Sequence, residues 1–428
     1  MAARTTRIAV SASLVTFLLT AAPLHAQTLS PEERQIASYV DLHLNEALAF
    51  FERIVNIDST TENLAGVREV GKAFGSEFEP LGFTARWLDM PAGMNRAGHL
   101  LAERQGSRGK RLLLIGHLDT VLKGERFVRD GAVARGTAVS DMKGGDVILL
   151  FALKALASTG ALKDTRIVVM LTGDEEMQGA PLSVSRGDLV GAAKRSDLVL
   201  SFEPEVDGKA TVGRRGISSW SLEVSGATGH SGQMFSAELG SGAIFEAARI
   251  LNAFYDRLHT EQYLTFNPSV IVGGTDVTTN GWQGTASGKH NVVPQAVRVS
   301  GDLRFISEEQ KAHAREVMRD IVSQNLPKTK AVITFEDEFP AMSVTPGNQA
   351  LLADLDRVSR DLGFGAVEPL DPSQRGAGDI SFVAPIISGL DGLGIGGGKA
   401  HAPGEYAELD RLPLLIKRAA LLIYRLTR

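Results

Sequence analysis

Three short apolar runs in the sequence each end in histidine or in acidic residues. Residues 111–115 (RLLLI) lead into His117 and Asp119, residues 166–171 (RIVVML) into Glu175 and Glu176, and residues 197–202 (DLVLSF) into Glu203. In open α/β sheets the site lies outside the carboxyl ends of the strands, so these side chains are expected to gather at one edge. Folding alone does not explain why three buried strands should all end in such groups.

Two further candidates lie in glycine-rich segments. Asp141 precedes the glycines at 144 and 145, and His401 follows the glycines at 396–398. Each has an ordinary explanation by itself, because aspartate commonly caps helices and loops often carry histidine. Their occurrence together with the acidic strand ends favours a shared site.

This collection of two histidines and at least three carboxylates predicts a metal centre. The chain has no cysteine, so any metal must be held by histidine, aspartate and glutamate. Such ligands suit a catalytic zinc ion or a similar divalent ion such as Co²⁺ or Mn²⁺. Five candidates are one more than a tetrahedral zinc needs, and they fit two ions about 3.5–4 Å apart that share a bridging carboxylate.

The elements that must position these residues predict an α/β fold with a mostly parallel sheet and helices on both faces. Buried strands at 111–115, 166–171 and 197–202 alternate with helical patterns such as 146–158. Ser30, Pro31 and Glu33 form a capping box that opens a helix expected to run to about residue 54. A final helix is expected from residue 410 to about 426.

Between residues 213 and 340 the pattern changes to that of a small α+β sandwich. Alternating strands are expected at 218–224, 295–305 and 331–336, with amphipathic helices at 241–258 and 308–325. We therefore expect four parts: a signal peptide at 1–26, a catalytic domain in two parts at 27–212 and 341–428, and an inserted lid and dimerisation domain at 213–340.

The N-terminus has the pattern of a secretory signal peptide. Arg4 and Arg7 precede an apolar stretch at 8–20, and a cut is expected between Ala26 and Gln27. The alternative is an uncleaved membrane anchor, but the stretch is short for a membrane span. We expect a periplasmic or secreted protein without a stable membrane anchor.

The charge composition argues against a nucleic-acid partner. With 45 Lys and Arg against 50 Asp and Glu, the net charge is −5, which leaves no basic surplus to neutralise phosphates.

The motifs HLDT, GTAVSDMKGG, TGDEEMQG, FEP and KAHAPGEYAEL stand in this order and resemble the di-zinc carboxypeptidase and aminoacylase family. Its members include bacterial glutamate carboxypeptidase, acetylornithine deacetylase and succinyl-diaminopimelate desuccinylase. The resemblance covers nearly the whole chain after residue 26, including the inserted domain. It implies two zinc ions per chain and a di-zinc exopeptidase catalytic domain.

The resemblance also implies a role for each candidate. Asp141 would bridge the two ions, His117 and Glu203 would complete one metal site, and Glu176 and His401 the other. Glu175 would be the general base acting on the water between the ions. Asp119 would orient His117.

In the inserted domain, the segment 229–232 (GHSG) matches the family's histidine motif. The resemblance implies that His230 reaches the site of a partner subunit in a homodimer joined through residues 213–340. Asn291 and Arg304 match positions that hold the terminal carboxylate of the substrate. Three features depart from the family pattern. Ser140 precedes the bridging Asp141, Arg375 lies in a stretch expected to be small and neutral, and Arg214 with Arg215 makes the connecting segment unusually basic.

These implications favour a metallo-carboxypeptidase that releases a C-terminal amino acid, most simply glutamate, from short peptides or N-acyl (folate-like) amino acids. An N-acyl-amino-acid deacylase is the alternative, since it also frees an amino acid from an amide. A periplasmic solute-binding protein is an alternative of another class. Metal analysis separates the classes, because the enzyme should hold about two zinc ions per chain.

Overall fold

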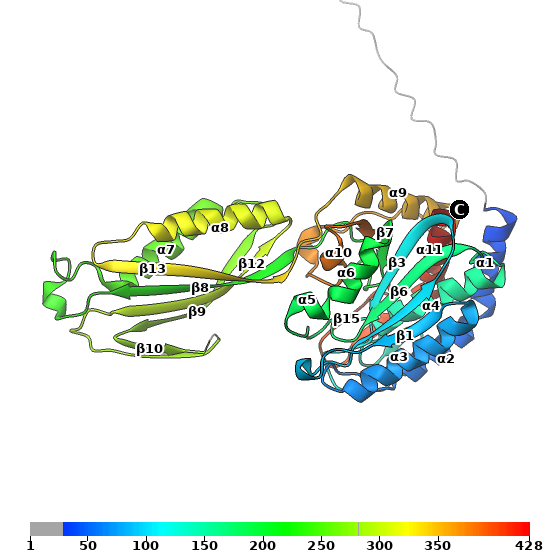
Figure 1. Cartoon of the computed structure of the whole chain (residues 1–428), viewed down its shortest axis with the longest axis horizontal. Helices are drawn as coiled ribbons and strands as arrows, with labels where there is room; N and C mark the ends of the chain where they lie inside the picture. Colours follow the sequence, from blue (N-terminus) through cyan, green and yellow to red (C-terminus); the bar gives the residue numbers. More distant parts are fainter. Residues whose placement is uncertain (1–28, 281) are drawn as a thin grey trace, which may run out of the picture.

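The computed structural model describes residues 29–280 and 282–428, and the expected signal peptide at 1–26 lies outside this part of the chain. Figure 1 shows two bodies joined by a narrow connection. The larger body contains both ends of the described chain, and the smaller one is formed by a segment inserted between them. None of the helices formed by the described residues is long and apolar enough to cross a membrane.

The larger body is built on a six-stranded sheet with the order β1-β2-β6-β3-β7-β14. Strands β6, β3, β7 and β14 are parallel, while β1 and β2 add an antiparallel edge. The bounds are β1 Thr84–Leu88, β2 His99–Arg104, β3 Arg108–His117, β6 Thr165–Thr172, β7 Leu198–Ser201 and β14 Ser388–Leu390. The predicted mostly parallel sheet is confirmed.

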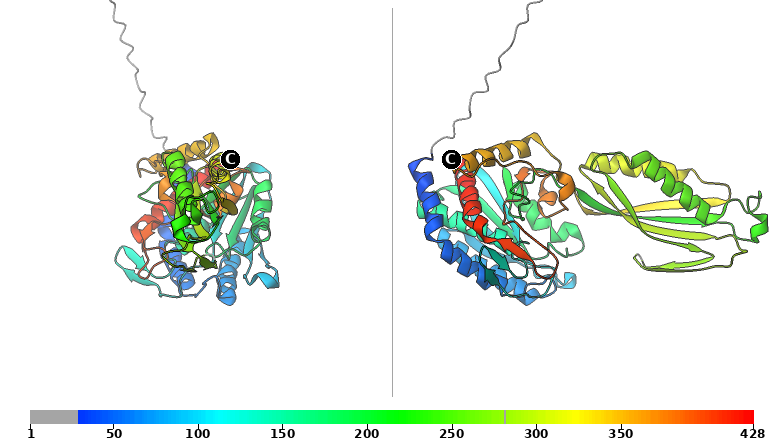
Figure 2. Two further views of the ribbon diagram at one scale, coloured as in Figure 1. Left: turned by 90° about the vertical axis from the view of Figure 1, so that its left-hand side faces the viewer. Right: turned by 180° about the vertical axis from the view of Figure 1, so that it is seen from behind.

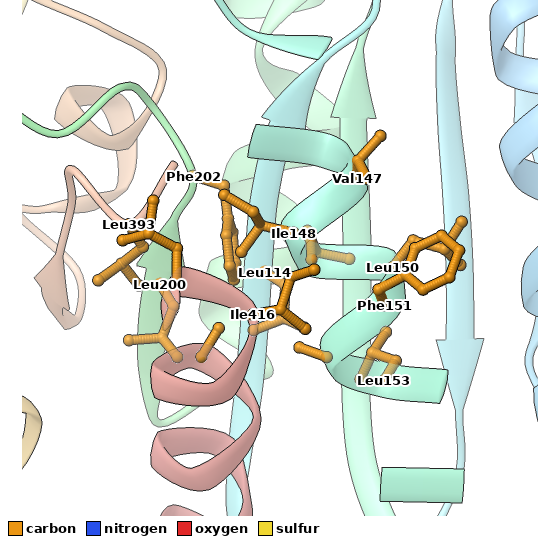
Figure 3. Close-up of a cluster of buried hydrophobic side chains, with 14 of the residues drawn as sticks. Leu114, Val147, Ile148, Leu150, Phe151, Leu153, Leu200, Phe202, Leu393 and Ile416 are labelled. Carbon is orange, nitrogen blue, oxygen red and sulfur yellow. The ribbon is translucent and has the colours of Figure 1, made fainter. Parts of the chain in front are cut away.

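Helices cover both faces of this sheet because the central strands are apolar on both sides. Leu112 and Leu114 face one core, with helices α1, α2, α3, α4, α9 and α11, whereas Leu113 and Ile115 face the other, with α6 and α10. Figure 3 shows Leu114 and Leu200 packed against Ile148 of α4 and Ile416 of α11. The helices are α1 Pro31–Leu42, α2 Leu44–Val55, α3 Leu64–Phe78, α4 Lys143–Ser158, α5 Leu182–Ser185, α6 Gly187–Lys194, α9 Pro346–Asp361, α10 Ile380–Val383 and α11 Leu412–Leu426.

The first helix corrects the prediction of one helix from residue 30 to about 54. The capping box of Ser30 and Glu33 is present, but the helix ends at His43, where φ is −112°. The two helices pack differently: α1 packs against both α11 and α4, whereas α2 packs mainly against α4.

The smaller body is an antiparallel sheet with the order β13-β8-β12-β9, covered on one face by α7 and α8. The alternation of buried and exposed residues along β8 and β12 follows from this single covered face. Figure 2 shows this body from two further sides. Its elements are β8 Gly216–Gly226, α7 Gly242–Leu258, β9 Thr265–Gly274, β10 Asp276–Thr279, β11 Gly284–Ser287, β12 Ala296–Phe305, α8 Glu308–Ser323 and β13 Thr329–Phe339.

Two connecting segments run antiparallel between the bodies. Arg214 and Met342 exchange both backbone hydrogen bonds, at 2.9 and 3.0 Å. The segments therefore leave and re-enter the larger body side by side.

A second small sheet brings distant loops of the larger body together. Its order is β15-β16-β5-β4, with bounds β4 Val128–Asp130, β5 Val133–Arg135, β15 Gly397–Gly398 and β16 Tyr406–Glu408. The pairing of β16 with β5 places the loop before Tyr406 beside the segment that follows Arg135.

Candidate metal centre

The strand ends converge as the order of the sheet requires. His117 is the last residue of β3, and the strands on either side of β3 are β6 and β7. Glu175 and Glu176 follow β6, and Glu203 follows β7. Because the three strands are parallel, all these side chains lie at the same edge of the sheet.

One group of possible metal ligands comprises His117, Asp141 and Glu203, whose ligand atoms lie within 4.8 Å of one another. His117 Nε2 is 3.3 Å from Asp141 Oδ1 and 3.7 Å from Glu203 Oε1. The other ring nitrogen of His117, Nδ1, is 3.1 Å from the backbone oxygen of Asp119. A proton on Nδ1 that is donated to this oxygen leaves the lone pair of Nε2 free for a metal.

A second group comprises Asp141, Glu176 and His401, again within 4.8 Å. His401 Nε2 is 3.1 Å from Asp141 Oδ2 and 3.0 Å from Glu176 Oε2. The backbone of His401 has a φ of +62°, in the left-handed region that is rare for residues other than glycine. The two groups share Asp141, which turns one carboxylate oxygen toward each of them.

The electrostatics of the site call for additional positive charge. Burial raises the pKa of Glu175 well above its usual range and raises that of Glu203 to about 7. Hydrogen bonds to Asp141 and Glu176 raise the pKa of His401 to about 10. Burial also opposes the charge of Asp141, but hydrogen bonds from His117 and His401 lower its pKa overall. Four carboxylates thus share two imidazoles, an arrangement that divalent cations would stabilise.

Glu175 lies beside these groups but belongs to neither of them. Its backbone N–H donates to Asp119 Oδ1 at 3.0 Å, and that of Glu176 donates to Asp119 Oδ2 at 3.1 Å. Thr61 also donates its hydroxyl to Asp119 Oδ2 at 2.7 Å. The buried Asp119 carboxylate therefore orients the segment carrying Glu175 and Glu176. It lies 3.6 Å from His117 Nδ1, so the ring is held by the backbone oxygen of Asp119 rather than by the carboxylate.

Glu405 is a positioning residue that the sequence analysis did not single out. Its buried carboxylate accepts hydrogen bonds from the backbone N–H groups of Ala138, Ser140 and Asp141 at 2.7, 2.8 and 3.0 Å, and from the Ser140 hydroxyl at 2.8 Å. Ser140, a departure from the family pattern, is thus used to hold the loop. The quoted motif KAHAPGEYAEL contains Glu405, but only the packing of β16 against β5 reveals its partners.

Arg186 is a second such residue. Its guanidinium donates to Asp174 Oδ1 at 2.6 Å and lies 2.7 Å from Asp379 Oδ1, all with almost no solvent exposure. Arg186 therefore neutralises Asp174, the buried first member of the acidic run at 174–176.

The candidates of the smaller body lie at opposite ends of its sheet. Arg304 pairs with Ile217 near the connection, and its Nε donates to Asp302 Oδ2 at 2.8 Å. His230 and Asn291 lie beyond the other ends of β8 and β12, where the N–H of Ser231 donates to the Asn291 oxygen at 2.9 Å. Strand β8 has 11 residues, which corresponds to roughly 35 Å at about 3.3 Å per residue. The structure therefore brings His230 and Asn291 together, away from the end of the sheet that adjoins their own metal centre.

Residues 113–425 match the family model described as Peptidase family M20/M25/M40. Carboxypeptidase G2 from Pseudomonas sp. is 28% identical to this chain over 387 residues, covering 87% of each protein. A succinyl-diaminopimelate desuccinylase from Erythrobacter litoralis is 24% identical over 402 residues, covering 88% of this chain and 98% of the relative.

Solved structures share the whole two-body fold. A tripeptidase from Staphylococcus aureus has a TM-score of 0.65 at 21% identity and covers 92% of this chain and 99% of its own. A dinuclear metal-binding peptidase of Bacillus subtilis has a TM-score of 0.64 at 14% identity, and the match covers 90% of this chain and 99% of the peptidase. A metallo-carboxypeptidase from Sulfolobus solfataricus has a TM-score of 0.60 at 16% identity, and the match covers 89% of this chain and 99% of the carboxypeptidase.

Proposed function

This chain belongs to Peptidase family M20/M25/M40 and is a metallopeptidase-type hydrolase of amide bonds; on that premise, we propose that it is a carboxypeptidase with two metal ions per chain. Its substrates would be short peptides or N-acyl (folate-like) amino acids, and its product a free C-terminal amino acid, with glutamate the first candidate. The alternative of a solute-binding protein is set aside, because a family of hydrolases accounts for the chain. The observation that carries the proposal is the pair of ligand groups joined by Asp141.

The donor set fits two zinc ions. His117 and Glu203 would bind one ion, and Glu176 and His401 would bind the other. Asp141 would be a ligand of both ions. Nitrogen and carboxylate oxygen donors are typical of catalytic zinc, and divalent cations would stabilise carboxylates held this close together. When bound, such ions act as Lewis acids and lower the pKa of water.

The chain's own residues would carry the proton and hold the substrate. Glu175 would take a proton from the attacking water and deliver it to the leaving nitrogen, which makes it the general base and then the general acid. His230 of a partner subunit would donate a hydrogen bond to the oxygen that gains negative charge. Arg304, together with Asn291 of the partner subunit, which lies beside His230, would hold the terminal carboxylate, to which the planar guanidinium is well matched.

The proposal predicts that a free terminal carboxylate is required. Amidating that carboxylate should abolish turnover, and Arg304→Ala should raise KM by about 10- to 100-fold, the value of a lost charge-assisted hydrogen bond. Kinetics on N-acyl amino acids and dipeptides with free and amidated termini measure both effects, and metal analysis of Arg304→Ala should find unchanged metal. Equal cleavage of free and amidated substrates would contradict the carboxypeptidase assignment.

An N-acyl-amino-acid deacylase is the second candidate, favoured by the similarity to the desuccinylase of Erythrobacter litoralis. Both enzymes release an amino acid, but they differ in the group that they accept on the other side of the amide. A screen that compares peptidyl, aromatic acyl and small acyl groups on the same amino acid separates them. A strict preference for a small acyl group would select the deacylase.

We further propose a homodimer joined through residues 213–340, in which His230 serves the partner's metal centre. The supporting observation is that His230 lies beyond the end of β8 opposite the connection. Homodimers of His230→Ala and of Glu175→Gln should each be nearly inactive. In a refolded one-to-one mixture half of the dimers are mixed, and about a quarter of all sites should regain activity.

The mixing experiment has a clear opposite outcome. If His230 acted within its own chain, every site in the mixture would remain defective. Activity no higher than that of the parents, with mixed dimers demonstrated by differential tags, would contradict the shared site. Full activity of His230→Ala alone would remove the residue from the mechanism.

For location, we propose export to the periplasm or beyond, on the pattern of residues 1–26. N-terminal sequencing of the protein from its host should begin at Gln27. A protein that keeps Met1 or remains with the membranes would contradict this.

A further inference from the structure

Arg375 has an unusual environment beside the metal centre. It lies in the loop between the short helix Pro372–Gln374 and α10, and its Nη2 is 3.7 Å from Glu203 Oε2. The side chain is only 12% exposed. Two of its nitrogens, Nε and Nη2, are buried without a hydrogen-bond partner among the described residues.

The neighbouring Arg214, in contrast, has a fully hydrogen-bonded guanidinium and a structural role. Its Nε donates to the Gly376 oxygen at 2.7 Å, its Nη1 to Asp391 Oδ2 at 2.6 Å, and its Nη2 to the Ala377 oxygen at 2.6 Å. Arg214 thereby ties the loop that carries Arg375 to the connecting segment. Arg214 also forms an ion pair with Asp391. The Asp391 carboxylate is therefore not available to neutralise Arg375.

Glu203 does not neutralise Arg375 either. It is the only carboxylate within 4 Å of that guanidinium among the described residues, and the gap of 3.7 Å is too long for a hydrogen bond. Glu203 also belongs to the ligand group of His117 and Asp141, where a bound cation would take up its charge. A buried arginine with unpaired N–H groups is costly, so its presence beside the centre points to an anion that arrives from outside.

We propose that Arg375 is a specificity-determining residue that binds a second carboxylate of the substrate, additional to the terminal carboxylate assigned to Arg304. The inference rests on the proposed function and narrows its substrate class to dianionic amides. The carboxylate would accept hydrogen bonds from Nη2 and from Nη1, the guanidinium nitrogen that is not among the buried unpaired atoms, on the side of the centre where Glu203 lies. This second carboxylate can belong to the side chain of the released amino acid or to the acyl group.

Matched substrate pairs test the inference and separate the two sources. N-acetyl-L-glutamate and N-acetyl-L-glutamine differ only in the charge of the side chain, whereas N-succinyl-L-alanine and N-succinamoyl-L-alanine differ only in the charge of the acyl group. The metal-loaded wild type should prefer the acidic member of one pair by about 10- to 100-fold in kcat/KM. Arg375→Met, of similar length, should abolish this preference and leave turnover of the neutral member within about threefold. Arg375→Lys should retain part of the preference.

Calorimetry provides a readout that does not depend on turnover. The binding of each acidic product is compared with that of its neutral analogue. The two pairs are L-glutamate with L-glutamine, and succinate with succinamate. Wild type should bind the acidic member of the relevant pair more tightly, and Arg375→Met should bind both members alike. The control is Arg357→Met, which alters an exposed arginine on α9 that pairs with Asp354 and should change neither preference.

The outcomes are distinct. An acidic preference that survives in Arg375→Met, with metal content intact, overturns the inference. Loss of metal with equal loss of activity on both members also overturns it, since Arg375 would then only support Glu203. Equal use of acidic and neutral members by wild type overturns the inference but leaves the proposed function standing. Absence of any amide hydrolysis across the broad screen contradicts the proposed function, while the calorimetric preference still decides the role of Arg375.

Discussion

Glu175→Gln is expected to lower kcat by at least about 10²–10⁴-fold, the usual contribution of a general base. The substitution keeps the size of the side chain and removes its ability to accept a proton. Glu175 lies outside both ligand groups, so the metal content should remain that of the wild type. Steady-state kinetics and elemental analysis of the same preparation measure the two quantities.

Glu176→Gln is the informative comparison. Its carboxylate contacts His401 at 3.0 Å and belongs to the ligand group, so this variant should lose metal as well as activity. Glu69→Gln, on the exposed surface of α3, controls for the loss of one negative charge. If Glu175→Gln loses its metal while Glu176→Gln retains it, the two roles have been interchanged.

Asp141→Asn should remove the ligand that the two groups share. We expect the affinity for both ions to fall by more than about 100-fold, the upper end of what the loss of an indirect metal partner costs. Metal per chain should fall from about two to near zero after dialysis, and turnover should fall below detection. Elemental analysis and isothermal titration with zinc measure the loss.

His401→Ala provides the matched comparison, because His401 belongs to only one of the groups. This variant should retain about one ion per chain, held by His117, Asp141 and Glu203. Circular dichroism should show that both variants are folded, since neither residue lies in the hydrophobic core. Retention of two ions by Asp141→Asn would contradict the shared ligand, and with it the dinuclear centre.

The sequence by itself determined the parallel sheet and the place of the candidate residues along it. Apolar runs are local patterns, and both faces of a central parallel strand must be buried, so β3, β6 and β7 could be predicted from the local sequence alone. The acids and histidine that follow those runs then had to share one edge. The two antiparallel edge strands and α3 were not predicted, because their patterns are weaker than those of the central strands.

The tertiary structure decided the features that depend on partners distant in the sequence. The break at His43 separates α1, which packs against both α11 and α4, from α2, which packs mainly against α4. Glu405 holds the Asp141 loop from 264 residues away, and Asp119 reaches the backbone of Glu175 from 56 residues away. The position of His230 beyond one end of β8 and the unpaired nitrogens of Arg375 are likewise consequences of packing. Hydrophobic periodicity specifies which face of an element is buried, but hydrogen-bond partners and unsatisfied charges are determined only when the elements are assembled in space.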